Sequence, residues 1–522
     1  MNLALIGTMA KNPNNWARSW VFVAFWTALF TISAKILFTL PGPAGPLLWQ
    51  FAFIGIATFF MPLEIVLLQF LAFFVFFEQT LWYIYNPGIE TIYERELFNI
   101  KPVEFLIACT GLRLFFSNQI RIPVPRALFL ISSAWFLTIL LGFAVAFANG
   151  NRLYDMFIIS EFRTLLLTIA AVFCFLAFLT RELSHVINLL LVLAAAKVIV
   201  TLASLITGLD ILWPASAEGY VGHLAAFYGS DFNVRIATLA LTFAALYLLF
   251  GTHQRNAYLT ASIRIDNQSA VWHSAFPRWI YVVVLLLVML AIFLSMRRGG
   301  IVGLLVVVGL VGWHMRLSHK LVLGALAATL LVAVVADAGS GWVFFPQQVQ
   351  GLYGRILLED SASQISTWGH LLDIYEGWQA ALSSPIFGLG PGSRLELSRM
   401  AFYNLEPSLL VHQNLIHVWI KYGLIGVALY LVTFFMPIAT ALKNWQKISV
   451  FCGPLAGATM LGGAYFLISQ LITEFFTPPF FQNVRSSLGV AFAIAAIYAP
   501  LVKSGKTALE HRTFSDLSNR EV

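Results

Sequence analysis

Two apolar runs that meet at a pair of arginines decide the fold of this chain. Residues 279–296 read WIYVVVLLLVMLAIFLSM, Arg297 and Arg298 follow, and residues 299–315 read GGIVGLLVVVGLVGWHM. A helix that crosses the hydrocarbon core of a bilayer needs about 20 predominantly apolar residues, and about 17–25 are tolerated. The stretch therefore predicts two transmembrane helices with the arginine pair at their junction.

The composition of the whole chain points the same way. Of the 522 residues, 59% are hydrophobic and 11% are charged, whereas about 25% of the residues of a typical soluble domain are charged. A water-soluble fold buries only about three quarters of its surface near 300 residues, so it could not hide this much apolar surface. The composition argues against a soluble enzyme and a disordered chain. Because no basic run reaches five residues, we also expect no nucleic-acid partner.

Further apolar runs predict an all-α polytopic membrane protein with 12–14 transmembrane helices. The candidate spans are 19–40, 47–61, 63–83, 102–116, 127–148, 164–180, 186–207, 232–251, 279–296, 299–315, 321–337, 412–436, 453–472 and 486–502. We predict N-terminal transmembrane helices over 1–337, a large periplasmic loop over 338–411, C-terminal transmembrane helices over 412–502 and a cytoplasmic tail over 503–522.

Positively charged residues predict the orientation, because short cytoplasmic loops collect Lys and Arg. With fourteen spans the positive loops alternate regularly and both termini are cytoplasmic. The loops 252–278 and 316–320 lie on the same side of the membrane and together hold five positive residues. They outnumber the two arginines at the other end of the helix that follows Gly299. Arg297 and Arg298 are therefore expected on the outside, together with the loop 338–411.

An amphipathic helix is predicted inside that loop, lying against the membrane domain or closing over a cavity. The apolar residues at helical spacing are Leu371, Ile374, Tyr375, Trp378 and Leu382, and Pro385 follows them. Gly388, Gly390 and Gly392 come next. We interpret them as a hinge or a place of close backbone approach, because no strand precedes them as it would in a nucleotide-binding loop.

Ionisable residues at the ends of membrane helices are functional candidates. On the outer side these include Arg163, Arg235, Arg297, Arg298 and His412. Arginines at such positions can bind phosphate groups, but the pair at 297–298 could instead contact lipid headgroups, and Arg163 could simply pair with Glu161. At the positive end of a helix His412 would stay neutral and available as a base, or it could be an ordinary hydrogen-bonded interfacial histidine.

Metal and redox chemistry have little support in the sequence. His412 and His417 are five residues apart, about 140° around a helix, so they do not share a face on which to hold a metal ion. Cys109, Cys174 and Cys452 lie inside apolar runs and behave as small hydrophobic residues. We predict no metal site and no cofactor.

Four segments, in order, resemble motifs of the O-antigen ligase and Wzy polymerase superfamily over roughly residues 230–430. Residues 293–300 (FLSMRRGG) resemble its Ser-x-x-Arg-Gly element, and residues 385–392 (PIFGLGPG) its P-x-x-G-x-G-x-G element. Residues 412–426 (HQNLIHVWIKYGLIG) are similar to its His-Asn…Glu-x-Gly-x-x-Gly signature, and residues 229–235 to its aspartate-x-asparagine entrance. Two positions depart from the pattern: Gln413 precedes the asparagine, and Lys421 stands where the family often has an acid.

The resemblance implies transfer of a glycan from a polyprenyl-diphosphate carrier to an acceptor hydroxyl, at the periplasmic face of the bacterial inner (cytoplasmic) membrane. Arg298 matches the motif arginine and would stabilise the leaving diphosphate, with Arg297, Arg235 and Arg163 as further binding residues. His412 matches the motif histidine and would deprotonate the acceptor. Attack without a protein nucleophile predicts inversion. The first external loop, residues 41–46, contains no acid, which fits metal-independent chemistry.

Three activities remain open. We favour a polymerase that joins lipid-linked repeat units, with a ligase acting on lipid A-core or on protein hydroxyls as the alternative. The implied partners are the polyprenyl-diphosphate-linked glycan donor, a glycan acceptor (a lipid-linked repeat or lipid A-core) and the membrane, and a chain-length regulator is a further candidate. A transporter or flippase is the alternative of another class. It would need charges at mid-bilayer depth and broken helices, whereas the charges here gather at outer helix ends.

Overall fold

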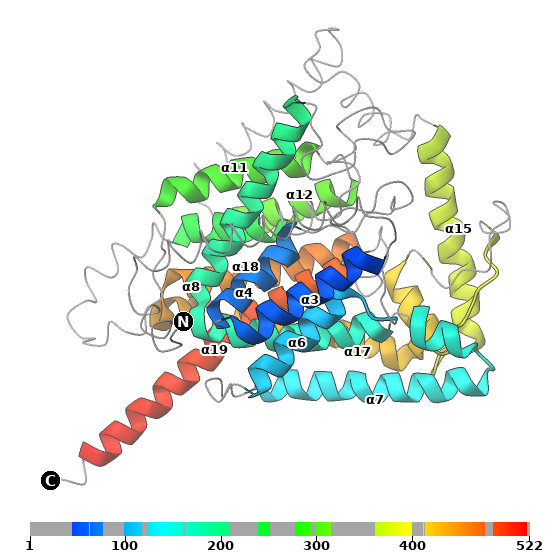
Figure 1. The fold of residues 1–522 in the computed structure, drawn as a ribbon. Helices are drawn as coiled ribbons and strands as arrows, with labels where there is room; N and C mark the ends of the chain where they lie inside the picture. The colour runs from blue at the N-terminus through cyan, green and yellow to red at the C-terminus, as the bar shows by residue number, and fades with distance from the viewer. Residues whose placement is uncertain are drawn as a thin grey trace, which may run out of the picture.

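The structure is a computed structural model of the 522-residue chain. It describes residues 44–61, 63–76, 99–116, 124–159, 162–207, 238–250, 277–294, 298–314, 361–398, 411, 413–474 and 484–518. The regular structure in these ranges is helical, and they contain no β-strand. The elements are α3 (Ala44–Phe60), α4 (Leu63–Phe76), α6 (Pro102–Phe116), α7 (Arg126–Ala148), the π-helix η1 (Asp155–Ile159), α8 (Phe162–Thr207), α11 (Arg278–Leu294), α12 (Arg298–Trp313), α15 (Ser361–Ser383), α17 (Asn414–Cys452), α18 (Pro454–Thr473) and α19 (Val484–Ser518) (Figure 1).

Five of the described helical segments are long and apolar enough to cross a membrane. They are Arg126–Ala148, Asp155–Ile199, Asn414–Cys452, Pro454–Thr473 and Ser486–Gly505. Shorter apolar helices lie at Leu48–Phe60, Thr238–Phe250, Arg278–Met289 and Val302–Trp313. The all-α, polytopic membrane fold predicted from the composition is confirmed.

Several predicted spans agree with the observed helices nearly residue for residue. The span 102–116 coincides with α6, 127–148 with α7 and 453–472 with α18, each within one residue at either end. The two runs around the arginine pair become α11 and α12. These helices are bounded by clear changes in hydropathy, which is the physical property that partitions a helix into lipid.

One predicted division agrees with a kink, and one predicted boundary is wrong. The spans 164–180 and 186–207 lie in α8, which consists of two helical parts that meet at a kink at Glu182, where φ is −135° and ψ is 50°. Figure 1 shows the two parts of α8 running in different directions. The predicted end of the span 412–436 is wrong, because α17 continues through Pro437 to Cys452. Lys443 and Lys447, which fall between the predicted spans 412–436 and 453–472, therefore lie on this helix.

The main core is built from α8, α17, α18 and α19, which pack against one another extensively. Phenylalanine rings fill its centre: Phe175 lies 5.0 Å from both Phe70 and Phe492, measured between ring centroids. A Cβ at Gly462 would lie 2.3 Å from Phe243, so glycine lets α18 approach its neighbour closely. In a membrane, such close packing replaces the hydrophobic driving force that lipid removes.

α7 is attached at the edge of this core. Trp135, which is buried, donates an N–H···O hydrogen bond of 2.8 Å to Thr433 Oγ1 on α17. The opposite side of α7 exposes large apolar residues such as Phe129, Phe136 and Leu140. An exposed apolar face on a helix long enough to span a bilayer is the face that contacts lipid.

α15 is oriented differently from α7. It runs across the direction of α7, near the end of α7 that leads into η1 (Figure 1). It packs on the first part of α17 around a small second core made of Ala381, Leu395, Leu397, Val411, Ile416 and Ile420. The segment between α15 and α17 contains the glycine-rich turn, so this end of the molecule gathers the motifs that the sequence singled out.

Candidate active site

The glycine-rich turn is held against three other segments by its backbone. Gly388, Gly390 and Gly392 have φ values of +74°, +83° and +75°, a region that side chains disfavour. A Cβ on Gly388 would lie 2.7 Å from the backbone of α17, and one on Gly390 would lie 2.6 Å from Ala146 at the end of α7. One on Gly392 would lie 2.7 Å from the backbone nitrogen of Met156. Close backbone approach is what these three positions have in common.

The turn pairs with an interruption in α17. Gly423 has a φ of +66° and a ψ of −168°, so the helix is broken there and backbone groups on both sides become available. Leu389 N–H donates to the carbonyl of Ile420 (2.5 Å) and Gly390 N–H to that of Lys421 (3.1 Å). Leu424 N–H donates to the carbonyl of Pro385 (2.9 Å). The turn therefore satisfies backbone groups that the break in α17 would leave unpaired.

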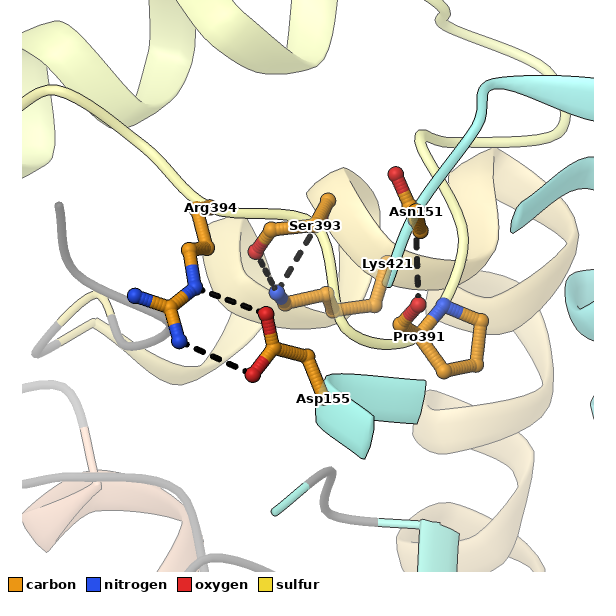
Figure 2. Close-up of polar contacts among 6 residues, drawn as sticks. All are labelled: Asn151, Asp155, Pro391, Ser393, Arg394 and Lys421. Carbon is orange, nitrogen blue, oxygen red and sulfur yellow. Dashed lines mark hydrogen bonds and ion pairs between the residues drawn. The ribbon is translucent and has the colours of Figure 1, made fainter. Parts of the chain in front are cut away.

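Side chains from distant segments fasten the same turn (Figure 2). Arg394 donates from Nε and Nη2 to the two carboxylate oxygens of Asp155, at 2.7 and 2.9 Å. The ammonium of Lys421 donates to the carbonyl oxygen (2.6 Å) and the hydroxyl (3.0 Å) of Ser393. Asn151 donates to the carbonyls of Leu389 and Pro391, at 3.1 and 3.0 Å.

This group of side chains is largely buried. Asp155 and Lys421 are 1% and 0% exposed, whereas the side chain of Arg394 is 25% exposed. A buried carboxylate or ammonium is stable only when it is paired and hydrogen-bonded. Asp155 is paired with Arg394, and Lys421, at the position where the family often has an acid, is hydrogen-bonded to Ser393. We call Asp155, Arg394, Lys421, Ser393 and Asn151 the turn clamp.

Of the predicted site arginines and histidine, the structure describes two, Arg163 and Arg298, and not the other three. Arg235, Arg297 and His412 lie outside the described residues. Arg298 is the first residue of α12, at the junction predicted for it. Arg163, in the first turn of α8, donates from Nη2 to Glu104 Oε2 and to the carbonyl of Asn99, both at 2.6 Å. Its ion-pair partner is therefore on α6, and the pairing proposed with Glu161 lies outside the described residues.

The neighbours of His412 are well fixed. Val411 is fully buried, and Gln413 is buried and caps α17 by accepting a hydrogen bond from Ile416 N–H at 2.6 Å. His417 is fully buried, and its Nδ1 accepts a long hydrogen bond of 3.4 Å from Val411 N–H. The chain therefore enters and leaves position 412 through two residues that packing and hydrogen bonds hold in place.

Sequence reasoning missed a buried polar network that begins two residues after His412. Asn414 Nδ2 donates to the hydroxyl of Tyr430 and to the carboxylate of Glu474, and the Tyr430 hydroxyl also donates to that carboxylate. Gln470 Nε2 donates to the other oxygen of Glu474 at 2.5 Å. Glu474 is 1% exposed and ends α18. An acid directly after the apolar run 453–472 was the available signal, because acids at such positions are costly unless they have a role.

Metal ligands do not gather in this part of the molecule. Within the described ranges, no three His, Cys, Asp or Glu side chains come close enough to hold a metal ion. The polar groups that do gather are amides, hydroxyls and one carboxylate around Asn414, together with the turn clamp. Such groups position a backbone and a side chain, and they can orient a base.

Comparison with known families agrees with the motifs. Residues 281–431 match the O-antigen ligase family model. The match supports the O-antigen ligase and polymerase superfamily and confirms the resemblance seen in the motifs. It supports an O-antigen ligase/polymerase-type membrane enzyme in general, and the apolar helices indicate a multi-pass membrane protein. No curated protein matched the chain in a separate comparison.

The O-antigen ligase match covers some of the site and omits the rest. It includes α11 from Tyr281 onward, α12, α15, the glycine turn and α17 up to Leu431. Asp155 and Glu474, the two acids that tie the turn and the start of α17 in place, lie outside it. Asp155 precedes the matched region in the sequence, and Glu474 follows it.

Proposed function

We propose that this protein is a membrane glycosyltransferase that polymerises polyprenyl-diphosphate-linked oligosaccharide repeat units at the periplasmic side of the bacterial inner membrane. The observation that carries the proposal is the family match at residues 281–431, which contains the motif arginine at 298 and the motif histidine at 412. The donor is the lipid-linked glycan, and the acceptor is a hydroxyl of a second lipid-linked unit.

His412 is the proposed base. Attack by the acceptor oxygen on the anomeric carbon breaks the bond to the diphosphate, and His412 takes the proton of the acceptor hydroxyl. Because no protein nucleophile takes part, the product is inverted at the anomeric carbon. The buried neighbours Val411 and Gln413 support this role, since a base must be held within hydrogen-bond reach of its proton.

The arginines are proposed to bind the diphosphate. Negative charge grows on the leaving diphosphate as the glycosidic bond breaks, and fixed cations stabilise it. Arg298, Arg297 and Arg235 fill this role in the proposal. Arg163 was proposed with them, but its contact with Glu104 also gives it a structural task at the α6–α8 junction.

The buried network around Glu474 is proposed to position the base. Asn414, two residues from His412, is tied to Glu474 and Tyr430. A carboxylate in this place fixes the first turn of α17, and with it the residue that precedes the N-cap. Glu474 acts through Asn414 and is therefore a positioning residue in this scheme.

A transporter of a lipid-linked sugar is the alternative of another class, and two observations speak to it. α17 is broken at Gly423, and Lys197 is fully buried in α8, as broken helices and buried charges in transporters would be. The break in α17, however, is filled by the backbone of the glycine turn, since a Cβ on Gly423 would lie 1.9 Å from the carbonyl oxygen of Ile386. Backbone groups that already pair with the turn are not free to coordinate a transported substrate.

Purified protein in proteoliposomes with lipid-linked repeat units tests the proposal. The His412→Ala and Arg298→Ala variants should each lose at least about 100-fold in polymer formation, the usual contribution of a positioned base or of one charge-stabilising group. Arg126→Ala, an exposed arginine at the start of α7, is the matched control and should keep full activity. Undiminished product from both site variants would overturn the proposal.

The nature of the product separates the remaining activities. A ladder of polymer lengths supports polymerisation, whereas a single transfer to added lipid A-core identifies a ligase. Movement of the lipid-linked donor across the bilayer without any new glycosidic bond identifies a transporter.

A further inference from the structure

The amphipathic helix α15 presents its apolar stripe away from the protein. The side that packs on α17 carries Asp373, Gly377 and Ala381, all of which are buried. On a helix these three positions lie close to one line, because they are spaced four residues apart. Of the apolar residues at helical spacing, Ile374 packs against the small second core, whereas Leu371, Tyr375, Trp378 and Leu382 are exposed.

A glycine explains why α15 packs through this face. A Cβ on Gly377 would lie 2.9 Å from Ile416 Cγ2 and 3.1 Å from Val411 Cγ1. The absence of a side chain there lets α15 approach the start of α17 closely. On the flank, Glu376 accepts a hydrogen bond of 2.8 Å from Ser398 N–H and fixes the rotation of the helix.

The exposed stripe is large and apolar. Trp368 is 72% exposed, Tyr375 64% and Leu371 51%, and Leu372, Trp378 and Leu382 are exposed as well. Monomeric proteins rarely leave a contiguous apolar surface of this kind without a partner. Tryptophan and tyrosine are also the residues enriched where a membrane meets water.

The stripe continues into the exposed apolar surface of a helix that is long and apolar enough to span a membrane. Trp378 packs edge-on against Trp419 of α17, with 4.9 Å between the ring centroids. Ile386 and Phe387, both exposed, follow α15. The carbonyl of Pro385 beside them accepts a hydrogen bond from Leu424 N–H. From there the exposed apolar residues Leu424, Ile425, Val432 and Phe435 continue along α17, one of the helices that can span a membrane.

The direction of α15 agrees with a place at the membrane surface. α7 is long enough to span the bilayer, and α15 runs across it near one end (Figure 1). A helix that lies in the plane of a membrane places its apolar face about 5–10 Å into the boundary between headgroups and acyl chains.

We propose that α15 is an interfacial helix whose apolar stripe is immersed in the bilayer surface, on the side where α7 ends and α17 begins. The occupant of the stripe is lipid. α15 then holds the glycine turn and the start of α17 at headgroup depth, independently of which glycan the enzyme handles.

Spin labels on single cysteines test this in the full chain, reconstituted in lipid nanodiscs. The variants are Leu371→Cys, Tyr375→Cys and Leu382→Cys, with the exposed Glu396→Cys in the following segment as the matched control. The three native cysteines are buried, and the labelled parent protein gives their background. At the three stripe positions, oxygen should relax the label more than a water-soluble nickel complex does, and at Glu396 the order should be reversed.

Three results would overturn the proposal. Preference for the nickel complex at all three stripe positions would place the stripe in water. Dipolar broadening between labels of two molecules, removed by dilution with unlabelled protein, would show that a second copy covers it. Protection of the stripe labels from the nickel complex that appears only when soluble polysaccharide is added would show that the stripe binds glycan.

Discussion

Asp155 and Arg394 are 239 residues apart in the sequence and form a two-point ion pair, with nitrogen–oxygen distances of 2.7 and 2.9 Å. The pair joins the segment after α7 to the segment after the glycine turn. Because the carboxylate is buried and the guanidinium is only partly exposed, water screens the pair weakly.

Breaking this pair should destabilise the fold. Asp155→Asn and Arg394→Gln should each lower the free energy of unfolding by about 1.5–3 kcal/mol, as is typical for hydrogen bonds to charged groups. The double variant should lose clearly less than the sum of the two. The measurement is unfolding of the purified protein in mixed micelles, with the exposed Glu396→Gln as the control. Additive losses, within about 0.5 kcal/mol, would contradict the coupling.

Replacing Gly423 should dislodge the turn. In Gly423→Ala the new methyl group would lie 1.9 Å from the carbonyl oxygen of Ile386, and the residue would keep a φ of +66° that alanine disfavours. We expect a loss of more than about 2 kcal/mol in stability and faster proteolysis near residues 385–392. Gly309→Ala in α12 is the control: nothing lies within 4 Å of its Cβ, and alanine there should be neutral or stabilising by up to about 1 kcal/mol. Equal effects of the two substitutions would refute the role assigned to the break in α17.

The network at the start of α17 should govern catalysis through position. Asn414→Ala removes the tie to Glu474 and Tyr430, so kcat should fall by at least tenfold while KM for the lipid-linked donor changes little. Asn444→Ala, which removes a side-chain bond to the Thr440 carbonyl on the same helix, is the matched control and should leave kcat unchanged. Steady-state kinetics in proteoliposomes measures both. A change confined to KM would assign Asn414 to substrate binding instead.

Arg163 can be tested for a structural role. If its task is to hold α6 against α8, Arg163→Ala and Glu104→Gln should both lower stability, because both disrupt the same 2.6 Å ion pair. Arg163→Ala should lose more, because it also removes the hydrogen bond to the carbonyl of Asn99. KM for the donor should then rise in neither. A higher KM in Arg163→Ala alone would instead return Arg163 to the diphosphate-binding set. Thermal unfolding and donor titration on the same preparations distinguish the two results.

Hydropathy predicted the ends of a helix well where the helix ends at the same residues as its apolar run. α6 and α7 begin and end where the apolar runs do, and α15 ends two residues before Pro385, which cannot continue a helix. Hydropathy failed at the end of α17, whose charged residues at 443–447 looked like a loop. Helices continue through such residues when the side chains reach the edge of the membrane, and no local rule distinguishes the two cases.

The candidate site was less accessible to sequence reasoning. The three glycines of the turn were found by their spacing, but the groups that hold them come from residues 151–155 and 421, which no local pattern connects. Periodicity identified the apolar stripe of α15, but it does not say whether protein or lipid covers such a stripe. The burial of Gly377 shows that a small residue, rather than a large apolar one, marked the protein side.

The break at Gly423 is a point about which the longer part of α17 can tilt as a rigid helix. The part of α17 from Leu424 to Cys452 is about 43 Å long at 1.5 Å per residue. If a substrate shifts the glycine turn enough to tilt this part by about 10° at the break, the far end moves by about 7 Å. That end connects to α18 through Gly453. A shift of the glycine turn would therefore displace the junction of α17 and α18 on the other side of the membrane.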